Sequence, residues 1–268
     1  MPPIISMSAY EEVKNVLVFG DSGIGKTVLA ASAPKTLVLG VEQGLVSAKR
    51  QGSTADMWLI ESWGGLPTDK DAENNLRAAY RWLSKGGYRR YDWIDVDGIT
   101  EMQEMAKMQL LADGIEMDPN ASEYVLEWQS NLALQQMTKI MVKNFCKMPV
   151  NTVFTALPMD MDDAEGENKV MPFIDGKKGA ISQYVCGQMG AVGYMKQIAV
   201  RQGKEKVHKR RVYWEYRKPY FGKNRFGLPA YTDDLSLPAL VALMKDKKPA
   251  VTRTRTTPAR RTARVTGR

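Results

Sequence analysis

Residues 13–27, which read VKNVLVFGDSGIGKT, decide the fold of this chain. The first seven are largely apolar and rich in β-branched side chains, which is the pattern of a buried parallel strand. Residues 20–27 match the pattern G-x-x-x-x-G-K-[ST] at every fixed position, and small residues that favour a helix follow as far as Pro34. The sequence therefore predicts a phosphate-binding loop (P-loop) between a strand and a helix.

The predicted loop would hold phosphate with its backbone and with two side chains. Its glycines let backbone N–H groups curl around a β-phosphate. Lys26 would reach the β- and γ-oxygens, and the Thr27 hydroxyl would ligate Mg²⁺, so ATP and Mg²⁺ are the expected ligands. The nucleotide-binding residues expected in the loop are Gly20, Asp21, Ser22, Gly23, Ile24, Gly25, Lys26 and Thr27.

A magnesium ion at such a loop needs a carboxylate at the end of a neighbouring buried strand. Residues 91–97, YDWIDVD, predict that strand, and Asp95 and Asp97 project from the same face of it. Asp97 is favoured as the metal-site residue, because strand ends rather than strand interiors line the crevice of such sheets. Spacing alone does not separate the two, so Asp95 stays open as the alternative.

Hydrolysis needs a group that orients or deprotonates the attacking water near the γ-phosphate. Glu42 follows the predicted strand at residues 36–41 and would face the same crevice if that strand lies near the loop strand. An ordinary exposed loop acid is the alternative interpretation. The only histidine, His208, lies among basic residues, and we do not expect it to be catalytic.

The remaining hydrophobic patterns predict an α/β fold, with a mainly parallel central sheet flanked by helices and an antiparallel edge hairpin. Residues 190–200 and 207–217 form the expected hairpin, whereas residues 113–122 and 158–179 are expected to be loops. The other expected elements are strands at 36–41, 57–60, 91–96 and 150–156, and helices at 69–84, 99–112, 123–147 and 235–244.

The composition predicts one domain followed by a tail. A chain of 268 residues that is 44% hydrophobic can bury one sizeable core, which we expect over residues 1–244. Residues 245–268 contain almost no large apolar side chain, so they are expected to form a disordered basic tail. Cys146 and Cys186 predict buried free thiols. Without a secretory signal or an apolar run of about 18 residues, a soluble cytoplasmic protein is expected.

The net charge of +8 is concentrated in two stretches. Residues 201–225 hold ten Lys or Arg and two acids, and residues 245–268 hold nine and one, so each stretch carries +8. Such stretches are typical of polyanion-binding surfaces, because each neutralised phosphate releases counterions. A solvated arm is the alternative for the tail. In the first stretch the expected nucleic-acid contacts are Lys209, Arg210 and Arg211.

In the order of its motifs, the chain resembles the phage-encoded RecA-like recombination ATPases, annealing and recombinase proteins that act with single-stranded DNA. The resemblance covers roughly residues 13–240, and the order of the motifs carries it more than any later motif alone. Beside the P-loop it rests on VEQG at 41–44, VDGITE at 96–101, WQ at 128–129, PVNTVFTA at 149–156 and KNRFGLP at 223–229.

The resemblance implies a RecA-like P-loop NTPase fold and a role for several residues. It implies Glu42 as the water-activating glutamate, Asp97 as the carboxylate of the magnesium strand and Thr155 as a sensor of the nucleotide state. It also implies that Lys223 or Arg225 reaches the γ-phosphate bound by an adjacent subunit. The chain departs from the family pattern directly after the strand of Thr155, where Leu, Pro and Met replace a polar sensor residue.

The same comparison implies that DNA-binding loops follow the magnesium-strand helix and the strand of Thr155. The second loop corresponds to residues 158–179, where Lys177 and Lys178 are the expected phosphate contacts; the acidic run at 160–167 argues against the whole loop lying on DNA. Aromatic residues near the basic stretch could stack on bases, with packing as the alternative. They are Tyr213, Trp214, Tyr216, Tyr220 and Phe221.

Together these expectations describe an ATP-dependent, single-stranded-DNA-binding recombination protein that promotes annealing or strand exchange. Catalysis would rest on Lys26, Glu42 and Arg225 in a site shared between subunits of a ring or filament. A single-strand-binding protein is a further expected partner, and a membrane is not. The alternatives are a helicase or replication accessory ATPase on the same fold, a small-molecule P-loop kinase, and a DNA-binding module regulated by nucleotide without turnover.

Overall fold

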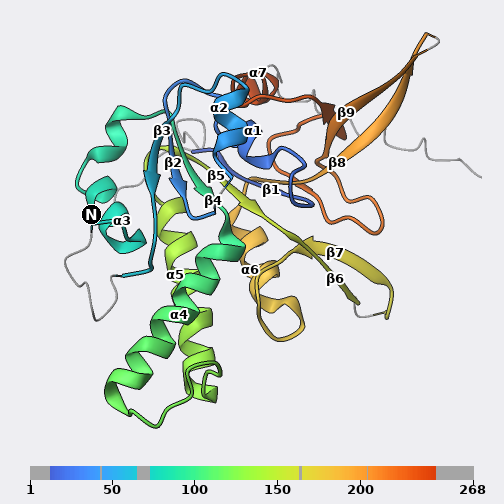
Figure 1. Ribbon diagram of the computed structural model, residues 1–268. Coiled ribbons are helices and arrows are strands. Elements are labelled where there is room, and N and C mark those ends of the chain that lie inside the picture. Colours follow the sequence, from blue (N-terminus) through green and yellow to red (C-terminus); the bar gives the residue numbers. More distant parts are fainter. Residues whose placement is uncertain (1–12, 43, 65–72, 163–164, 204, 246–268) are drawn as a thin grey trace, which may run out of the picture.

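The computed structural model describes residues 13–42, 44–64, 73–162, 165–203 and 205–245 (Figure 1). Of the predicted tail at 245–268, Lys245 ends helix α7 and the rest lies outside these residues, as does the first part of the helix expected at 69–84. No helix within the described ranges is both long and apolar enough to span a membrane.

The centre of the described structure is a nine-stranded mixed sheet with the order β11-β9-β8-β1-β5-β4-β2-β3, in which β10 also pairs with β8. The strands from β8 to β3 along this order are parallel, and β9, β10 and β11 pair in the antiparallel sense. The predicted fold class and the antiparallel hairpin are confirmed. The strands are β1 (Asn15–Phe19), β2 (Thr36–Gly40), β3 (Asp56–Leu59), β4 (Trp93–Asp97), β5 (Asn151–Ala156), β8 (Ala191–Gln202), β9 (Glu205–Tyr213), β10 (Lys223–Asn224) and β11 (Tyr231–Asp233).

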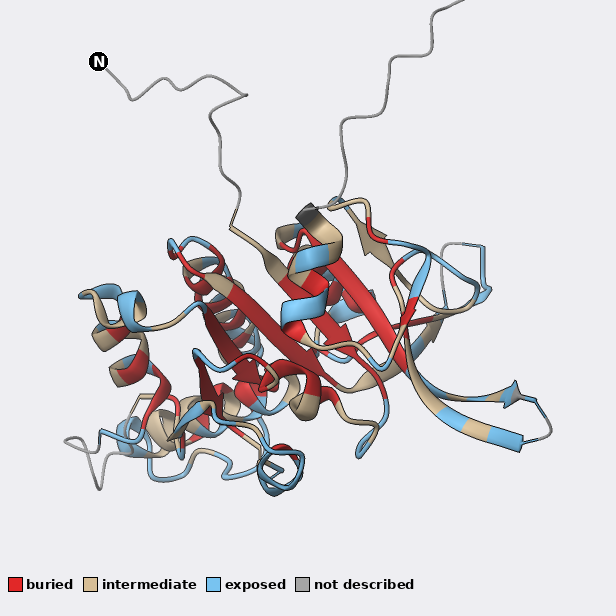
Figure 2. Cartoon of the chain, turned by 90° about the horizontal axis from the view of Figure 1, so that it is seen from above, coloured by how far each residue is buried: buried red, intermediate tan, exposed pale blue. Residues whose placement is uncertain are grey.

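Helices cover both faces of this sheet, because alternate side chains of each buried strand point to opposite sides. Leu17 and Phe19 of β1 pack with helices α3 to α6, whereas Val16 and Val18 pack with α1 and α7. Figure 2 shows the central strands buried between these layers. The helices are α1 (Lys26–Ala30), α2 (Val46–Arg50), α3 (Leu76–Ser84), α4 (Ile99–Met117), α5 (Trp128–Cys146), α6 (Ala180–Gln188) and α7 (Leu237–Lys245).

The prediction of a loop at residues 113–122 is wrong in its first half, because α4 continues to Met117. Asp113 does not end the helix; its carboxylate accepts a hydrogen bond from the Gln109 amide one turn earlier, at 2.8 Å. The extended helix packs along α5, which begins at Trp128 rather than at residue 123. Tertiary packing therefore overrides the turn-forming residues in this stretch.

The prediction of a long loop at residues 158–179 is also wrong, since this segment contains an antiparallel hairpin of β6 (Pro158–Asp162) and β7 (Asn168–Pro172). The hairpin is held by a distant segment: Val170 N–H donates to Pro219 O at 2.9 Å, and Phe221 N–H donates to Val170 O at 3.0 Å. No local pattern in the acidic run announces this pairing. Helix α6, which follows it, was not predicted.

Candidate nucleotide-binding site

The predicted P-loop leaves the carboxyl end of β1 and closes around the side chain of Lys26. The Lys26 ammonium is buried and donates hydrogen bonds to Gly20 O at 2.8 Å and Asp21 O at 2.9 Å. Gly20 N–H in turn donates to Ala156 O at 3.2 Å, which joins the loop to the end of β5. Burial lowers the pKa of Lys26, and Glu42 and Asp97 oppose this shift. The loop is thus organised around a cation at the position where phosphate would bind.

Asp97, at the end of β4, lies next to the loop although β5 separates β4 from β1. The Thr27 hydroxyl donates to Asp97 Oδ2 at 2.7 Å, and the Thr155 hydroxyl donates to Oδ1 at 2.5 Å. Asp95 is fully buried within the sheet, and neither of its carboxylate oxygens has a hydrogen-bond partner among the described residues. Burial, with the nearby Asp97 and Glu42, raises the pKa of Asp95 well above its usual value. The structure therefore brings Asp97, and not Asp95, to Thr27.

Glu42 reaches the same edge from β2, which is separated from β1 by β5 and β4. Its backbone N–H donates to Asp97 O at 3.0 Å. A Cβ atom on Gly98 would lie 2.7 Å from Glu42 Oε1 and 3.0 Å from Thr155 Oγ1, so the absence of a side chain there lets the three residues meet. Burial and the charge of Asp97 raise the pKa of Glu42, whereas Lys26 opposes the shift. Glu42 is therefore a half-buried acid of the site and not an exposed loop acid.

Thr27 and Asp97 fit the requirements of a magnesium site completed by a nucleotide. Within the described residues, no group of three or more His, Cys, Asp or Glu side chains could hold a metal ion. Mg²⁺ is usually bound by one or two protein oxygens together with phosphates and waters, rather than by a cage of protein ligands. A hydroxyl and a carboxylate beside a phosphate loop are such a pair.

Lys223 and Arg225 lie away from the P-loop of their own chain. Lys223 pairs with Val192 in β8, and Arg225 N–H donates to Gly190 O at 2.9 Å. These contacts lie at the amino ends of β1 and β8, whereas the P-loop follows the carboxyl end of β1. The Lys223 ammonium donates to the carbonyls of Cys186 at 2.8 Å and Gly187 at 2.9 Å. The structure thus does not bring these two cations to the phosphate site within one chain.

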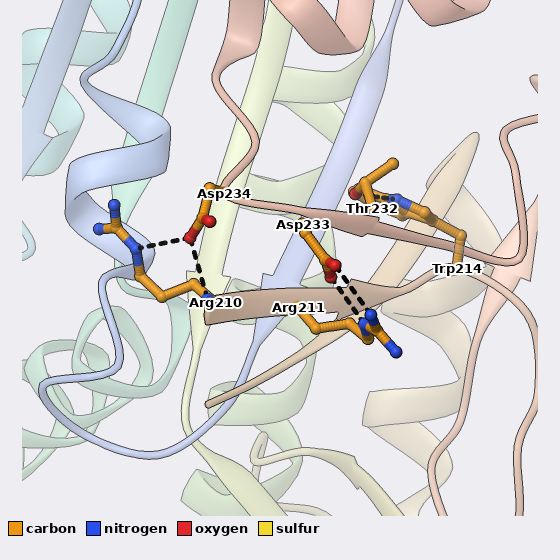
Figure 3. Close-up of polar contacts among 6 residues, drawn as sticks. All are labelled: Arg210, Arg211, Trp214, Thr232, Asp233 and Asp234. Carbon is orange, nitrogen blue, oxygen red and sulfur yellow. Dashed lines mark hydrogen bonds and ion pairs between the residues drawn. The ribbon is translucent and has the colours of Figure 1, made fainter. Parts of the chain in front are cut away.

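The residues predicted to contact nucleic acid lie in different surroundings. Lys177 and Lys178 are exposed in a short 3₁₀ turn before α6. Arg211 is committed to an ion pair, because its Nε and Nη2 donate to Asp233 at 2.6 and 2.8 Å and its guanidinium lies 3.8 Å from the Tyr231 ring centre (Figure 3). This hydrogen bonding raises the pKa of Arg211 and lowers that of Asp233.

Arg210 points to the other face of β9, where it packs against the P-loop at Gly25. It was predicted to contact nucleic acid together with its neighbours in sequence. Successive side chains of a strand alternate between faces, so the strand prediction already contained the signal that separates Arg210 from Lys209 and Arg211. Which face meets the loop is decided by the pairing of β8 with β1.

The aromatic residues near the basic stretch are mostly packed. Trp214 is fully buried and its indole N–H donates to Thr232 Oγ1 at 2.9 Å, so it does not offer a ring to a base (Figure 3). Tyr220 stacks on Tyr194 with ring centres 4.0 Å apart, and Phe221 packs against the core. Tyr216, which is 54% exposed, is the open ring of the group.

A match to a protein-family model identifies the family of this chain. No curated protein matches the sequence. Among solved structures, a KaiC-like protein from the archaeon Pyrococcus horikoshii OT3 is 17% identical, with 76% of this chain and 80% of that chain covered and a TM-score of 0.37. The flagellar accessory protein FlaH from Methanocaldococcus jannaschii is 8% identical, with 79% of each chain covered and a TM-score of 0.35. Residues 12–226 match the model of the AAA_24 family, described as an AAA domain, so the chain belongs to this family of P-loop NTPases.

Proposed function

We propose that this protein is an ATPase that binds single-stranded DNA and promotes annealing or strand exchange, with each ATP site shared between two subunits. The observation that carries the ATPase part is the meeting of Lys26, Asp97 and Glu42 at one edge of the sheet, reached from three separate segments of the chain. A loop that only bound phosphate would not need an acid of raised pKa beside it.

Each of these residues has a part in hydrolysis. Lys26 would exchange its two loop carbonyls for oxygens of the β- and γ-phosphates. Thr27 and Asp97 would hold Mg²⁺, which supplies neutralisation of the phosphate charge when bound. Glu42 would accept a proton from, or orient, the attacking water, and its raised pKa makes it a stronger base than an exposed glutamate. Thr155, hydrogen-bonded to Asp97, would sense the nucleotide state.

The DNA part of the proposal is supported by the β8–β9 hairpin, which projects from the sheet (Figure 1). Near the end of this hairpin, Arg201 lies directly opposite Lys206. Like charges in opposite positions of neighbouring strands destabilise the pair, and a polyanion on this surface would remove that repulsion. Lys177 and Lys178, exposed before α6, would add phosphate contacts.

Sharing of the site between subunits is supported by the position of Arg225. Its side chain is exposed at the amino ends of the strands, where it could reach only the nucleotide of a neighbouring molecule. Lys223 lies two residues earlier, in β10, where its ammonium donates to the carbonyls of Cys186 and Gly187. The protein would then assemble side by side into a ring or filament in the cytoplasm of a phage-infected cell, together with a single-strand-binding protein.

Steady-state ATP hydrolysis with and without DNA tests the proposed function, with Lys26→Ala as the blank. We expect single strands to stimulate hydrolysis by wild-type protein more than duplex DNA does, and the variant to show neither basal nor stimulated activity. Equal rates with and without either DNA would contradict the DNA part of the proposal, and ATP binding without turnover would contradict the ATPase part. Unwinding of a forked duplex would favour a helicase instead.

A further inference from the structure

Arg210 is the cation that lies against the P-loop on the side away from the acids of the site. A Cβ atom on Gly25 would lie 2.9 Å from Arg210 Nη1 and 3.0 Å from its Cδ. Gly25 has a φ of 105°, a conformation that residues with a side chain rarely adopt. The glycine that shapes the loop therefore also leaves the space into which the arginine packs.

Asp234 anchors Arg210 without occupying the outer end of its guanidinium. Arg210 N–H donates to Asp234 Oδ1 at 3.0 Å, and Asp234 N–H donates to Arg210 O at 2.8 Å. The Nε of Arg210 lies 3.9 Å from the same carboxylate oxygen. Figure 3 shows the outer guanidinium nitrogens directed away from Asp234, toward the segment that carries α1. The two Nη groups are thus presented to the P-loop side.

The order of the sheet decides which part of a nucleotide Arg210 faces. β5, β4 and β2, which bring Asp97 and Glu42, lie on one side of β1, and β8 and β9 lie on the other. Thr27 and Asp97 would hold Mg²⁺ and Glu42 would orient the attacking water, so the γ end of ATP belongs on the side of Asp97 and Glu42. The α-phosphate and the nucleoside then extend toward β8 and β9, where Arg210 lies.

We propose that Arg210 binds the α-phosphate of the nucleotide held by the P-loop of the same subunit. The inference rests on nucleotide binding at that loop and adds a contact from an element far away in the sequence. A guanidinium presents two parallel N–H donors to phosphate oxygens, which a lysine ammonium does not. Because ADP retains the α-phosphate, Arg210 contributes equally to the binding of ADP and ATP, unlike groups that touch the γ-phosphate.

Titration of full-length protein with fluorescent ATP and ADP analogues in the presence of Mg²⁺ tests the proposal. For Arg210→Gln we expect the Kd of both nucleotides to rise by about tenfold, which corresponds to about 1.4 kcal/mol. Arg210→Lys keeps the charge and loses the paired donors, so its Kd values should lie between those of the wild type and those of Arg210→Gln. Arg50→Gln removes an exposed arginine of α2 and serves as the matched control, with unchanged Kd values.

An unchanged Kd in Arg210→Gln, or a loss for ATP alone, would overturn the proposal. If Arg210→Gln does not fold by circular dichroism, Asp234→Asn tests the same contact, because it removes the charge that orients Arg210. That variant should raise the Kd values of ADP and ATP by the same smaller factor of about two to three. Unchanged Kd values, or unequal increases for the two nucleotides, would count against the proposal. Failure of wild-type protein to bind either nucleotide would instead contradict the proposed function itself.

Discussion

The two ends of the parallel strands carry two groups of predicted site residues whose surroundings differ. At the carboxyl ends, Lys26, Asp97 and Glu42 are buried or half-buried, and the charge of Asp97 contributes to the pKa of the other two. At the amino ends, Arg225 is exposed, and Lys223 is hydrogen-bonded to the end of α6. One chain therefore brings Lys26, Asp97 and Glu42 together, whereas Lys223 and Arg225, the cations proposed to act on a neighbouring subunit, lie at the opposite end of the strands.

Replacement of Arg225 by alanine is the strongest test of this difference. If the arginine acts on a neighbour's nucleotide, the rate of ATP hydrolysis should fall by about 10³-fold, as expected for an arginine finger. ATP affinity should stay unchanged, since the residue lies away from its own P-loop, and light scattering should show loss of self-association. Unchanged hydrolysis would remove the shared site. Mixing Arg225→Ala with Lys26→Ala protein should restore part of the activity, because the site is intact wherever the P-loop of the first variant meets Arg225 of the second.

Glu42→Gln tests the carboxyl end and should lower the rate of hydrolysis by about 10²- to 10³-fold with little change in ATP affinity. The pKa of Glu42 is raised by burial and by Asp97, so the wild-type rate should fall as the pH drops through that raised pKa and the carboxylate is protonated. The glutamine variant has no such group. If kcat of the variant falls at low pH in the same way as kcat of the wild type, another residue causes that fall.

Asp97→Asn and Asp95→Asn form a matched pair within β4. The first should raise the Mg²⁺ concentration needed for half-maximal hydrolysis by about 10- to 100-fold, because the hydrogen-bonded carboxylate beside Thr27 loses its charge. The second should leave hydrolysis within about threefold of wild type, since the carboxylate of Asp95 makes no hydrogen bond to the loop. Magnesium titrations of the two variants decide the question, and the reverse order would move the metal site to Asp95.

Asp95→Asn should also show the smallest effect, a pH-dependent gain in stability. The folded state holds the proton of Asp95 at a raised pKa, while the unfolded chain releases it at the ordinary pKa. The free energy of unfolding therefore falls as the pH rises above the ordinary pKa, and the asparagine variant avoids that loss. Its Tm should exceed the wild-type value by about 2–4 °C at pH 8 and by less at pH 5. A constant difference across pH would contradict this reasoning.

Much of the parallel core could be predicted from sequence because its signals are local. The P-loop pattern, the apolar strands around it and the acids that end two of them are each contained within a few residues, and β1, β2 and β4 lie within two residues of their predicted bounds. The hairpin of β6 and β7 could not be predicted in the same way, because Val170 of β7 is also held by backbone hydrogen bonds to the distant residues Pro219 and Phe221. The continuation of α4 likewise depends on its packing along α5.

The sequence by itself determined the P-loop, the parallel sheet and the choice of Glu42 and Asp97 as site candidates, because motif spacing and strand ends are local properties. Only the tertiary structure decided that Asp97 rather than Asp95 meets Thr27, and that Arg210 faces the loop while Arg211 pairs with Asp233. The physical reason is that strand order and register set which side chains meet. Both arise from pairings between segments more than a hundred residues apart, such as β1 with β5 and β8.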